Sequence, residues 1–156
     1  MPDPSTLAVW GLPGLFLAAM LAGSIVPMPS EAVLVAVLAG GVSPVTAVTV
    51  ATGGNVLGAL SLYLLGRWGA SGGGGRLEQW LARRKDREAP RLERARLRLQ
   101  RWGAPVLILS WLPLVGDAFV LAAGLVGVRV VPFLVFTTVG KGLRYVFVAV
   151  SAVTAL

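Results

Sequence analysis

Four charged side chains lie within long apolar stretches of the sequence: Glu31, Asp117, Lys141 and Arg144. On membrane-insertion scales, each charge at mid-bilayer costs about 2.5–3.5 kcal/mol, so four would cost on the order of 10–14 kcal/mol if nothing offset it. Two acids and two bases can cancel one another in an ion-pair network that only fixes helix register. A leucine would pack there without that cost, however, and intramembrane charges are by default functional. These residues are therefore the first candidates for a site.

The remaining side chains exclude many kinds of catalysis. The 156 residues include no cysteine and no histidine. Disulfides, thiol nucleophiles, haem or zinc sites and serine–histidine catalysis are therefore excluded. We expect a protein that is not an enzyme and that uses no cofactor and no metal.

The composition indicates an integral membrane protein. Hydrophobic residues make up 56% of the chain and charged residues 13%, whereas soluble chains are roughly a quarter charged. The apolar runs reach the length of about 20 residues that a transmembrane helix needs. We predict an all-α protein forming a single membrane domain over residues 1–156. Its N-terminus carries no basic residue, so we expect the first apolar run to be retained rather than cleaved as a signal.

The apolar runs and their interruptions divide the chain into six segments. The predicted segments are a transmembrane helix at 7–23, a broken segment at 26–43, a transmembrane helix at 45–66, a basic loop at 67–102, a second broken segment at 104–128 and a transmembrane helix at 130–152.

The broken segments contain helix-breaking residues, Pro27 and Pro29 in the first and Pro113 and Gly116 in the second. Backbone opened by a proline must be covered by protein or line a cavity when it lies in a bilayer. Each segment could span the membrane or turn back as a re-entrant hairpin. We favour two re-entrant hairpins, because Arg129 then lies on the cytoplasmic side, as the positive-inside rule prefers. The N-terminus is then cytoplasmic and the C-terminus outside.

An internal repeat relates the two broken segments. Glu31 precedes Gly54 by 23 residues, and Asp117 precedes Gly140 by the same number. Each acid follows a break and begins a new half-helix, where the helix dipole favours a carboxylate or a phosphate. Repeats of broken helices with central binding sites are typical of transporters.

The spacing also predicts which residues share a depth. Glu31 and Asn55 lie about 12 residues on either side of the first turn, so both lie roughly 18 Å from it in an antiparallel helix pair. Asp117 and Lys141 have the same relation to the second turn, and we expect them to meet. The candidate transport or substrate-binding residues are Glu31, Asn55, Asp117, Lys141, Arg144 and Tyr145.

The net charge of +7 is concentrated in the basic loop at 67–102, which holds eleven basic and four acidic side chains. Such a loop stays in the cytoplasm and attracts anionic lipid. Nucleic-acid binding is the other interpretation of a basic run, but bilayer segments flank this one and no aromatic stacking platform is evident. Apolar residues at helical spacing predict two amphipathic helices on the membrane surface, the alternative being a solvated loop. These residues are Leu77, Trp80 and Leu81 in the first helix, and Leu92, Ala95, Leu99 and Trp102 in the second.

Taken together, the motifs resemble the DedA family, also called the SNARE-associated or VTT-domain family, and its small YqaA-like branch. The motifs are Pro27-Met-Pro-Ser-Glu31, Gly54-Asn-Val-Leu-Gly58, Tyr63-Leu-Leu-Gly-Arg67, Ser110-Trp-Leu-Pro-Leu-Val-Gly-Asp117 and Gly140-Lys-Gly-Leu-Arg-Tyr145. The resemblance implies two inverted re-entrant hairpins with flanking helices in a multi-pass protein of the bacterial inner membrane. It also implies the transport of lipids such as undecaprenyl phosphate or phosphatidylethanolamine.

The sequence departs from the better-studied members of that family at two places. Their second acid, upstream of the first proline turn, falls where this chain has Ala22, Gly23 and Ser24. Their two arginines around the second proline are replaced by Ser110 and Gly116. We expect Lys141 and Arg144 to supply the missing positive charge.

Three functions remain open at this point. The leading hypothesis is a flippase or scramblase whose polar cavity between the hairpins passes a phosphate-bearing headgroup. The alternatives are a proton-coupled transporter of small solutes and a non-transporting membrane scaffold. The expected partners are membrane lipids, with anionic lipid at the basic loop and no nucleic acid; a homo-oligomer is left open.

Overall fold

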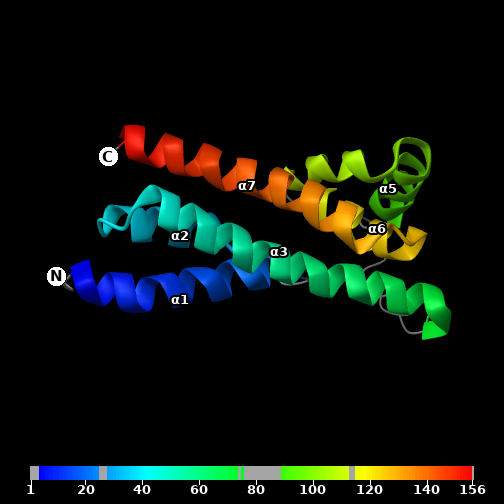
Figure 1. The fold of residues 1–156 in the computed structure, drawn as a ribbon, viewed down its shortest axis with the longest axis horizontal. Coiled ribbons are helices and arrows are strands. Elements are labelled where there is room, and N and C mark those ends of the chain that lie inside the picture. Colours follow the sequence, from blue (N-terminus) through cyan, green and yellow to red (C-terminus); the bar gives the residue numbers. More distant parts are fainter. Residues whose placement is uncertain (1–3, 25–27, 74, 76–88, 113–114, 156) are drawn as a thin grey trace. The chain divides into compact units, whose positions relative to one another are not determined.

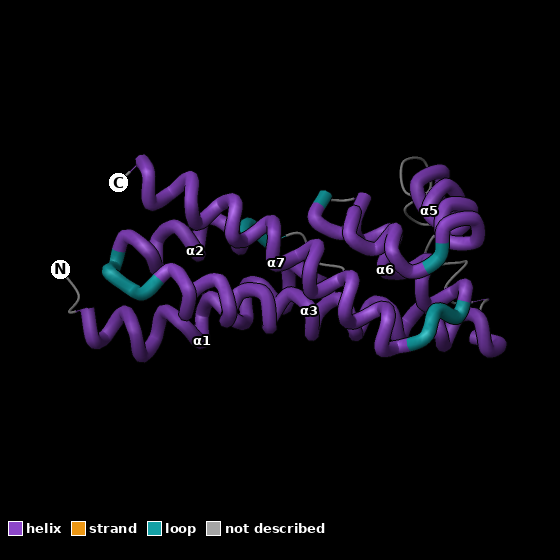
Figure 2. Tube along the Cα trace, turned by 45° about the horizontal axis from the view of Figure 1, so that its top comes forward, coloured by secondary structure: helices purple, strands orange, loops and turns teal. Residues whose placement is uncertain are grey.

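The computed structural model describes residues 4–24, 28–73, 75, 89–112 and 115–155. Helices account for nearly all of these residues, and no strand occurs among them (Figures 1 and 2). The helices are α1 (Pro4–Gly23), α2 (Ser30–Ala39), α3 (Pro44–Trp68), the π-helical turn η1 (Gly69–Gly73), α5 (Ala89–Trp102), the 3₁₀ helix η2 (Ala104–Trp111), α6 (Val115–Val126) and α7 (Val130–Ala155). The predicted all-α class is confirmed.

Two helical stretches are long and apolar enough to cross a membrane. They are Pro44–Ser71, of 28 residues, and Val130–Ala155, of 26 residues. At 1.5 Å per residue they extend about 42 and 39 Å, more than the roughly 30 Å of a bilayer's hydrocarbon core. The first extends to Ser71, beyond the predicted end at residue 66, because η1 continues the helical path after Trp68.

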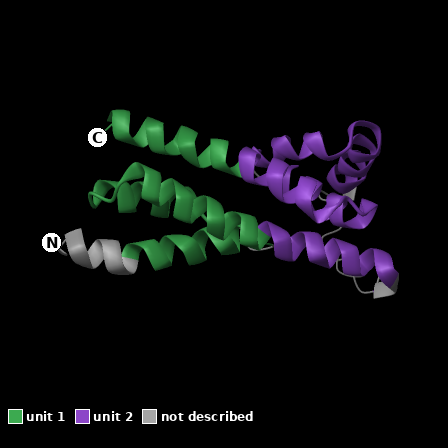
Figure 3. Ribbon diagram, in the orientation of Figure 1, with its two compact units in different colours: residues 1–58, 141–156 green, residues 59–140 purple. Residues whose placement is uncertain are grey.

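The chain forms two compact units (Figure 3). Unit 1 comprises Met1–Gly58 and Lys141–Leu156, and unit 2 comprises Ala59–Gly140. The long helices α3 and α7 each contribute one part to either unit. Each unit consequently has its own set of buried side chains.

Unit 1 packs α1 and α2 with the first part of α3 and the last part of α7 around an apolar core. The core side chains are Leu15, Ala19, Leu34, Val37, Leu38, Ala47, Ala51, Tyr145 and Ala149. A Cβ added to Gly54 or Gly58 of α3 would meet a backbone carbonyl of α1, that of Phe16 or of Met20. Small residues spaced four apart are a common way for membrane helices to approach this closely.

Unit 2 is built around α6, whose side chains from Phe119 to Ala123 are buried. The apolar face of α5, formed by Leu92, Ala95 and Leu99, is buried as well, and α5 packs on α6. The second predicted amphipathic helix is thus present, and α6 covers its apolar face; its placement on the membrane surface stays a prediction. Trp102, predicted to share that face, is exposed. The first predicted amphipathic helix, around residues 77–81, lies outside the described residues.

The two short helices α2 and α6, which the internal repeat relates, also end in a similar way. α2 has 10 residues and α6 has 12, about 15 and 18 Å, so neither can cross a bilayer alone. Each is followed by a glycine with positive φ, Gly41 at 84° and Gly127 at 80°. These glycines lie 86 residues apart, as do Glu31 and Asp117. Among the described residues of 26–43, α2 is the single helix, and α1 packs beside it.

The breaks lie close to where the sequence predicts them. Pro29 immediately precedes α2, and Glu31 lies in its first turn. Between η2 and α6 the helical path is likewise interrupted, and Asp117 lies in the first turn of α6. Gly116 belongs to that turn rather than to the break, and a Cβ there would meet the backbone of Ser110. Pro27 and Pro113 lie outside the described residues.

The long helix α7 has apolar side chains on its exposed side and polar side chains among its buried ones, the opposite of a helix in a soluble protein. Its outward side carries large apolar side chains along its whole length, while Thr137 and Lys141 are buried. The exposed apolar residues are Val130, Val131, Val135, Val139, Leu143, Val146, Phe147, Val150 and Val153. Monomeric soluble proteins rarely expose so extended an apolar surface, whereas a helix facing lipid requires one.

Candidate functional site

An ion pair between two helices of unit 1 forms the centre of the candidate site. The Glu31 carboxylate, in the first turn of α2, pairs with the Arg144 guanidinium of α7. Their side chains are 35% and 26% exposed, respectively, so the pair is partly open on one side. Two of the predicted site residues are therefore brought together, and the base that pairs with Glu31 comes from α7, outside the first broken segment.

A network of buried hydrogen bonds lies next to the ion pair. The Asn55 amide Nδ2 donates to the Tyr145 hydroxyl at 2.8 Å, and the Ser30 hydroxyl lies 2.9 Å from the same oxygen. All three side chains are buried. Because Ser30 precedes Glu31 and Tyr145 follows Arg144, the network fixes the register in which the two charges meet.

The contacts of Ser30 and Asn55 with Tyr145 can be compared with the prediction that Glu31 and Asn55 lie at the same depth. Ser30 and Asn55 stand on opposite sides of the α2–α3 turn, and both reach one hydroxyl group. Ser30, the residue before Glu31, thus shares a partner with Asn55, and the placement of Glu31 itself beside Asn55 stays a prediction.

Two polar atoms of this region have no hydrogen-bond partner among the described residues: Asn55 Oδ1 and Thr52 Oγ1. Thr52 lies one turn before Asn55 on α3 and close to Gly142 of α7. Unsatisfied buried acceptors are costly, so they mark places that can take a water molecule or a ligand donor. Thr52 was not predicted, although its position at i−3 from Asn55 could have indicated it.

The backbone around Asn55 is held by a close helix contact. A Cβ added to Gly23 of α1 would meet the carbonyl group of Asn55. No side chain larger than hydrogen fits at Gly23 unless α1 and α3 separate. The backbones of α1 and α3 are therefore in direct contact beside the candidate site.

The other two predicted charges, Asp117 and Lys141, belong to different units. Lys141, in unit 1, is only 2% exposed, and Asp117, in the first turn of α6 in unit 2, is partly buried. Their pairing stays a prediction.

Unit 2 contains buried hydroxyl groups that sequence reasoning missed. Ser110 Oγ and Thr137 Oγ1 have no hydrogen-bond partner among the described residues. A Cβ on Gly140, the repeat counterpart of Gly54, would meet the carbonyl of Ile108 and the hydroxyl of Ser110. The signal available in the sequence was the spacing of Thr137 and Gly140, which lie on one face of a helix at i and i+3.

Comparison with known proteins identifies the class that this fold and site define. A family model described as the VTT domain matches residues 26–153. The match includes both short helices, both long helices and the Glu31–Arg144 pair. The chain therefore belongs to the VTT-domain, or DedA, family of membrane proteins.

Two relatives extend the comparison over nearly the whole chain. The inner membrane protein YqaA of Escherichia coli (strain K12) is 38% identical over 143 residues, 91% of either chain. An uncharacterized protein of Haemophilus influenzae is 33% identical over 140 residues, 85% of this chain and 81% of its own. No solved structure matches. Of the described residues, no group of His, Cys, Asp or Glu is arranged to hold a metal ion.

Proposed function

We propose that this protein moves phospholipid across the membrane, its headgroup passing the Glu31–Arg144 ion pair while the acyl chains stay in lipid. The observation that carries the proposal is the pair itself, which joins two helices within apolar sequence and stays partly open. A pair needed only for packing would be replaced by apolar residues at little or no cost.

The chemistry of the two side chains matches a phospholipid headgroup. A guanidinium group is planar and binds phosphate through two parallel hydrogen bonds. An arriving phosphate can therefore displace the Glu31 carboxylate from Arg144. The released carboxylate can receive an ammonium group, such as that of phosphatidylethanolamine. Neither charge is left without a partner during this exchange.

The hydrogen-bond network beside the pair supports the same role. It holds the backbones next to Glu31 and Arg144 while their side chains change partners. The free acceptors Asn55 Oδ1 and Thr52 Oγ1 add capacity for an ammonium group or water. In this proposal Asp117 and Lys141 form a second polar step on the path.

The proposed topology is that of a multi-pass protein of the bacterial inner membrane with two re-entrant hairpins and a cytoplasmic basic loop. The shortness of α2 and α6 supports re-entrance, because neither could span the bilayer. The C-terminus then lies outside. A reporter fused at Leu156 that is active only in the cytoplasm would contradict this topology.

Translocation of labelled phospholipids by purified protein in liposomes tests the function. We expect Glu31→Gln and Arg144→Gln each to insert normally and to slow translocation about tenfold or more, as the loss of a charge-assisted hydrogen bond implies. Glu31→Asp should retain part of the activity, because the charge remains.

A second ion pair in the chain provides a matched control. Glu93 and Arg96 of α5 pair at 3.8 Å, with side chains 63% and 45% exposed. Glu93→Gln and Arg96→Gln remove the same charges from the surface and should leave translocation unchanged. If the Glu31 and Arg144 variants translocate lipid at the wild-type rate and lose only stability, the site is structural and the proposal is wrong.

A further inference from the structure

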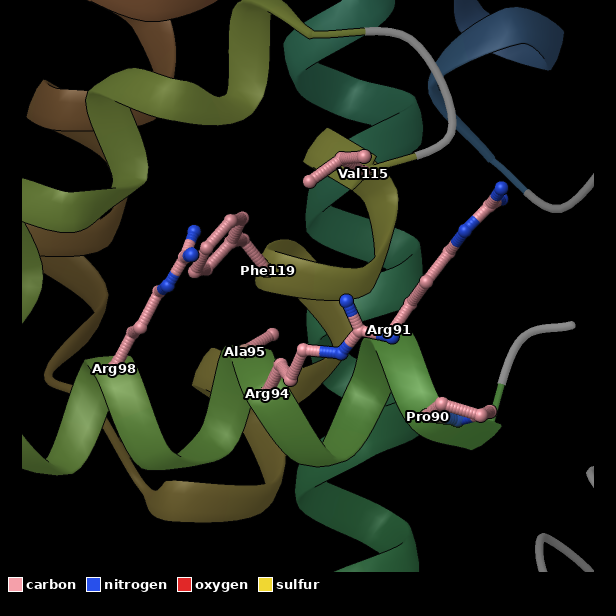
Figure 4. A pocket seen from close by; sticks show the side chains of 7 residues that line it. All are labelled: Pro90, Arg91, Arg94, Ala95, Arg98, Val115 and Phe119. Atoms are coloured by element: carbon pink, nitrogen blue, oxygen red, sulfur yellow. The ribbon is translucent and has the colours of Figure 1, made fainter.

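A groove between α5 and α6 in unit 2 lies outside the site described above. Its volume is about 510 Å³. The residues that line it are Pro90, Arg91, Arg94, Ala95 and Arg98 of α5, and Val115 and Phe119 of α6 (Figure 4). Ligand pockets commonly measure about 300–1,000 Å³, so the groove can hold more than a single ion.

Three arginines give one side of this groove its charge. Arg91, Arg94 and Arg98 occupy positions i, i+3 and i+7, which place them on one side of a helix. Figure 4 shows Arg98 reaching from α5 with its end beside the Phe119 ring, while Arg94 lies along α5 and Arg91 extends away from Phe119. No carboxylate is among the lining residues that the structure describes. The nearby acid on α5, Glu93, is paired with Arg96 instead.

The other side of the groove is apolar. Val115 and Phe119 face the arginines from α6, and Ala95 lies between them on α5. Arginines next to an apolar wall suit a molecule with an anionic head and a hydrocarbon body. A phosphate would accept paired hydrogen bonds from the guanidinium groups, and this would also relieve the repulsion among three like charges.

We propose that the α5–α6 groove is a binding site for an anionic phospholipid, with its phosphate on Arg94 and Arg98 and its glycerol and upper chains against Val115 and Phe119. The proposal does not depend on lipid transport, since the groove could hold a lipid that is never moved. It changes how α5 is expected to meet lipid. The apolar face of α5 packs on α6 and is not available to insert into a bilayer. In this proposal a single lipid molecule binds in the groove instead.

The neighbouring residues favour a lipid over a nucleic acid. Trp102 ends α5 with its ring exposed, and Arg101 lies over that ring. Tryptophan and arginine are enriched at the level of lipid headgroups. The apolar helix η2 begins directly after Gly103, so α5 ends where the membrane-embedded sequence starts.

Native mass spectrometry of the purified full chain, with short-chain phosphatidylglycerol and phosphatidylcholine as probes, tests the site. We expect the protein to retain phosphatidylglycerol in preference to phosphatidylcholine. The double variant Arg94→Gln/Arg98→Gln should weaken phosphatidylglycerol binding by about tenfold or more, since each 1.4 kcal/mol corresponds to a factor of ten.

The matched control is Arg96→Gln/Arg101→Gln, which removes the same charge from α5 outside the groove. It should weaken binding far less than the groove variant. An equal loss in both double variants would mean that lipid responds to net charge, and the site would be refuted. The melting temperature of each variant in detergent shows that neither has unfolded.

Two further probes separate the lipid from other anions. Soluble glycerol phosphate should bind much more weakly than short-chain phosphatidylglycerol, because it makes no contact with the apolar wall. Equal binding would overturn the assignment to lipid and leave an anion site. A short DNA duplex that binds more tightly than the lipid, and requires Arg94 and Arg98, would overturn it as well.

Discussion

Units 1 and 2, the two halves of the molecule, share a framework and differ in the chemistry built on it. Each has a short helix with an acid in its first turn, a left-handed glycine at its end and the first part of a long helix after it. In unit 1, Ser30 and Asn55 meet the hydroxyl of Tyr145 beside an ion pair. In unit 2, the buried tyrosine is Tyr63, whose hydroxyl donates to the carbonyl of Val128 at 2.5 Å.

The difference indicates that the repeat specifies backbone geometry and leaves side-chain roles free to diverge. Tyr63 stacks on Phe133 with ring centroids 4.3 Å apart, so it closes the α6–α7 turn and serves packing. Tyr145 instead joins polar groups from three helices. We therefore expect the polar chemistry of unit 1 to be more sensitive to mutation than the corresponding region of unit 2.

The largest effect is expected for Asp117 and Lys141, if the second repeat pairs them as the first repeat's spacing suggests. Breaking a buried ion pair by removing one partner costs about 3–5 kcal/mol. Asp117→Asn and Lys141→Met should each lower stability in detergent more than the double variant does. Additive losses would show that these side chains do not meet, and the two halves would then differ in their ion pairs too.

The Glu31–Arg144 pair should show a smaller coupling, because both side chains are partly exposed to begin with. Contacting residues typically couple by about 0.5–3 kcal/mol in double-mutant cycles. We expect Glu31→Gln and Arg144→Gln to fall in this range when unfolding is followed with denaturant. The Glu93–Arg96 cycle should give only about 0.3–0.5 kcal/mol, as exposed helical pairs do. Equal couplings would contradict a special role for the unit 1 pair.

The two buried tyrosines allow a direct comparison of the halves. Tyr145→Phe removes the acceptor of the Asn55 amide and leaves a buried donor unsatisfied, at a cost of about 1–3 kcal/mol. Tyr63→Phe removes one partly buried hydrogen bond and should cost about 0.5–1.5 kcal/mol. Thermal unfolding of the two variants measures the difference. A larger loss for Tyr63→Phe would reverse our view of which half carries the polar network.

The smallest difference between the two halves is expected at the glycines that follow their short helices. Gly41→Ala and Gly127→Ala both place a Cβ at positive φ, which costs roughly 1–2 kcal/mol. A Cβ at Gly41 would meet no other atom within 4 Å, and one at Gly127 would lie at ordinary contact distance, 3.6 Å, from Arg67. The two variants should therefore lose nearly equal stability. Unequal losses would show that the turns are not equivalent.

Much of the fold could be predicted from local patterns. The long helices follow from uninterrupted apolar runs, and the breaks near Pro29 and before Asp117 follow from residues that cannot continue a helix. The constant rise of a helix is also consistent with Ser30 and Asn55, on either side of the first turn, reaching the same hydroxyl. Each of these inferences depends on residues that are close in sequence or separated by one turn.

The features that escaped prediction depend on which surfaces pack together. Glu31 takes its base from α7, because α7 packs in unit 1 with α2, and no spacing within residues 26–66 contains that information. The apolar face of α5 illustrates the same limit. The periodicity of apolar residues shows that an apolar surface covers Leu92 and Leu99. The same periodicity would be seen whether that surface is lipid or α6.

The separation of Glu31 and Arg144 along the chain has a consequence for biosynthesis. Arg144 is made 113 residues after Glu31. At about 5–20 residues per second, Arg144 is synthesised roughly 6–23 s after Glu31. During that interval water or the insertion machinery must accommodate the carboxylate at the start of α2. Unit 1 can close only once the last helix arrives, so a chain truncated before residue 141 should be recognised by quality-control proteases as an unfinished membrane protein.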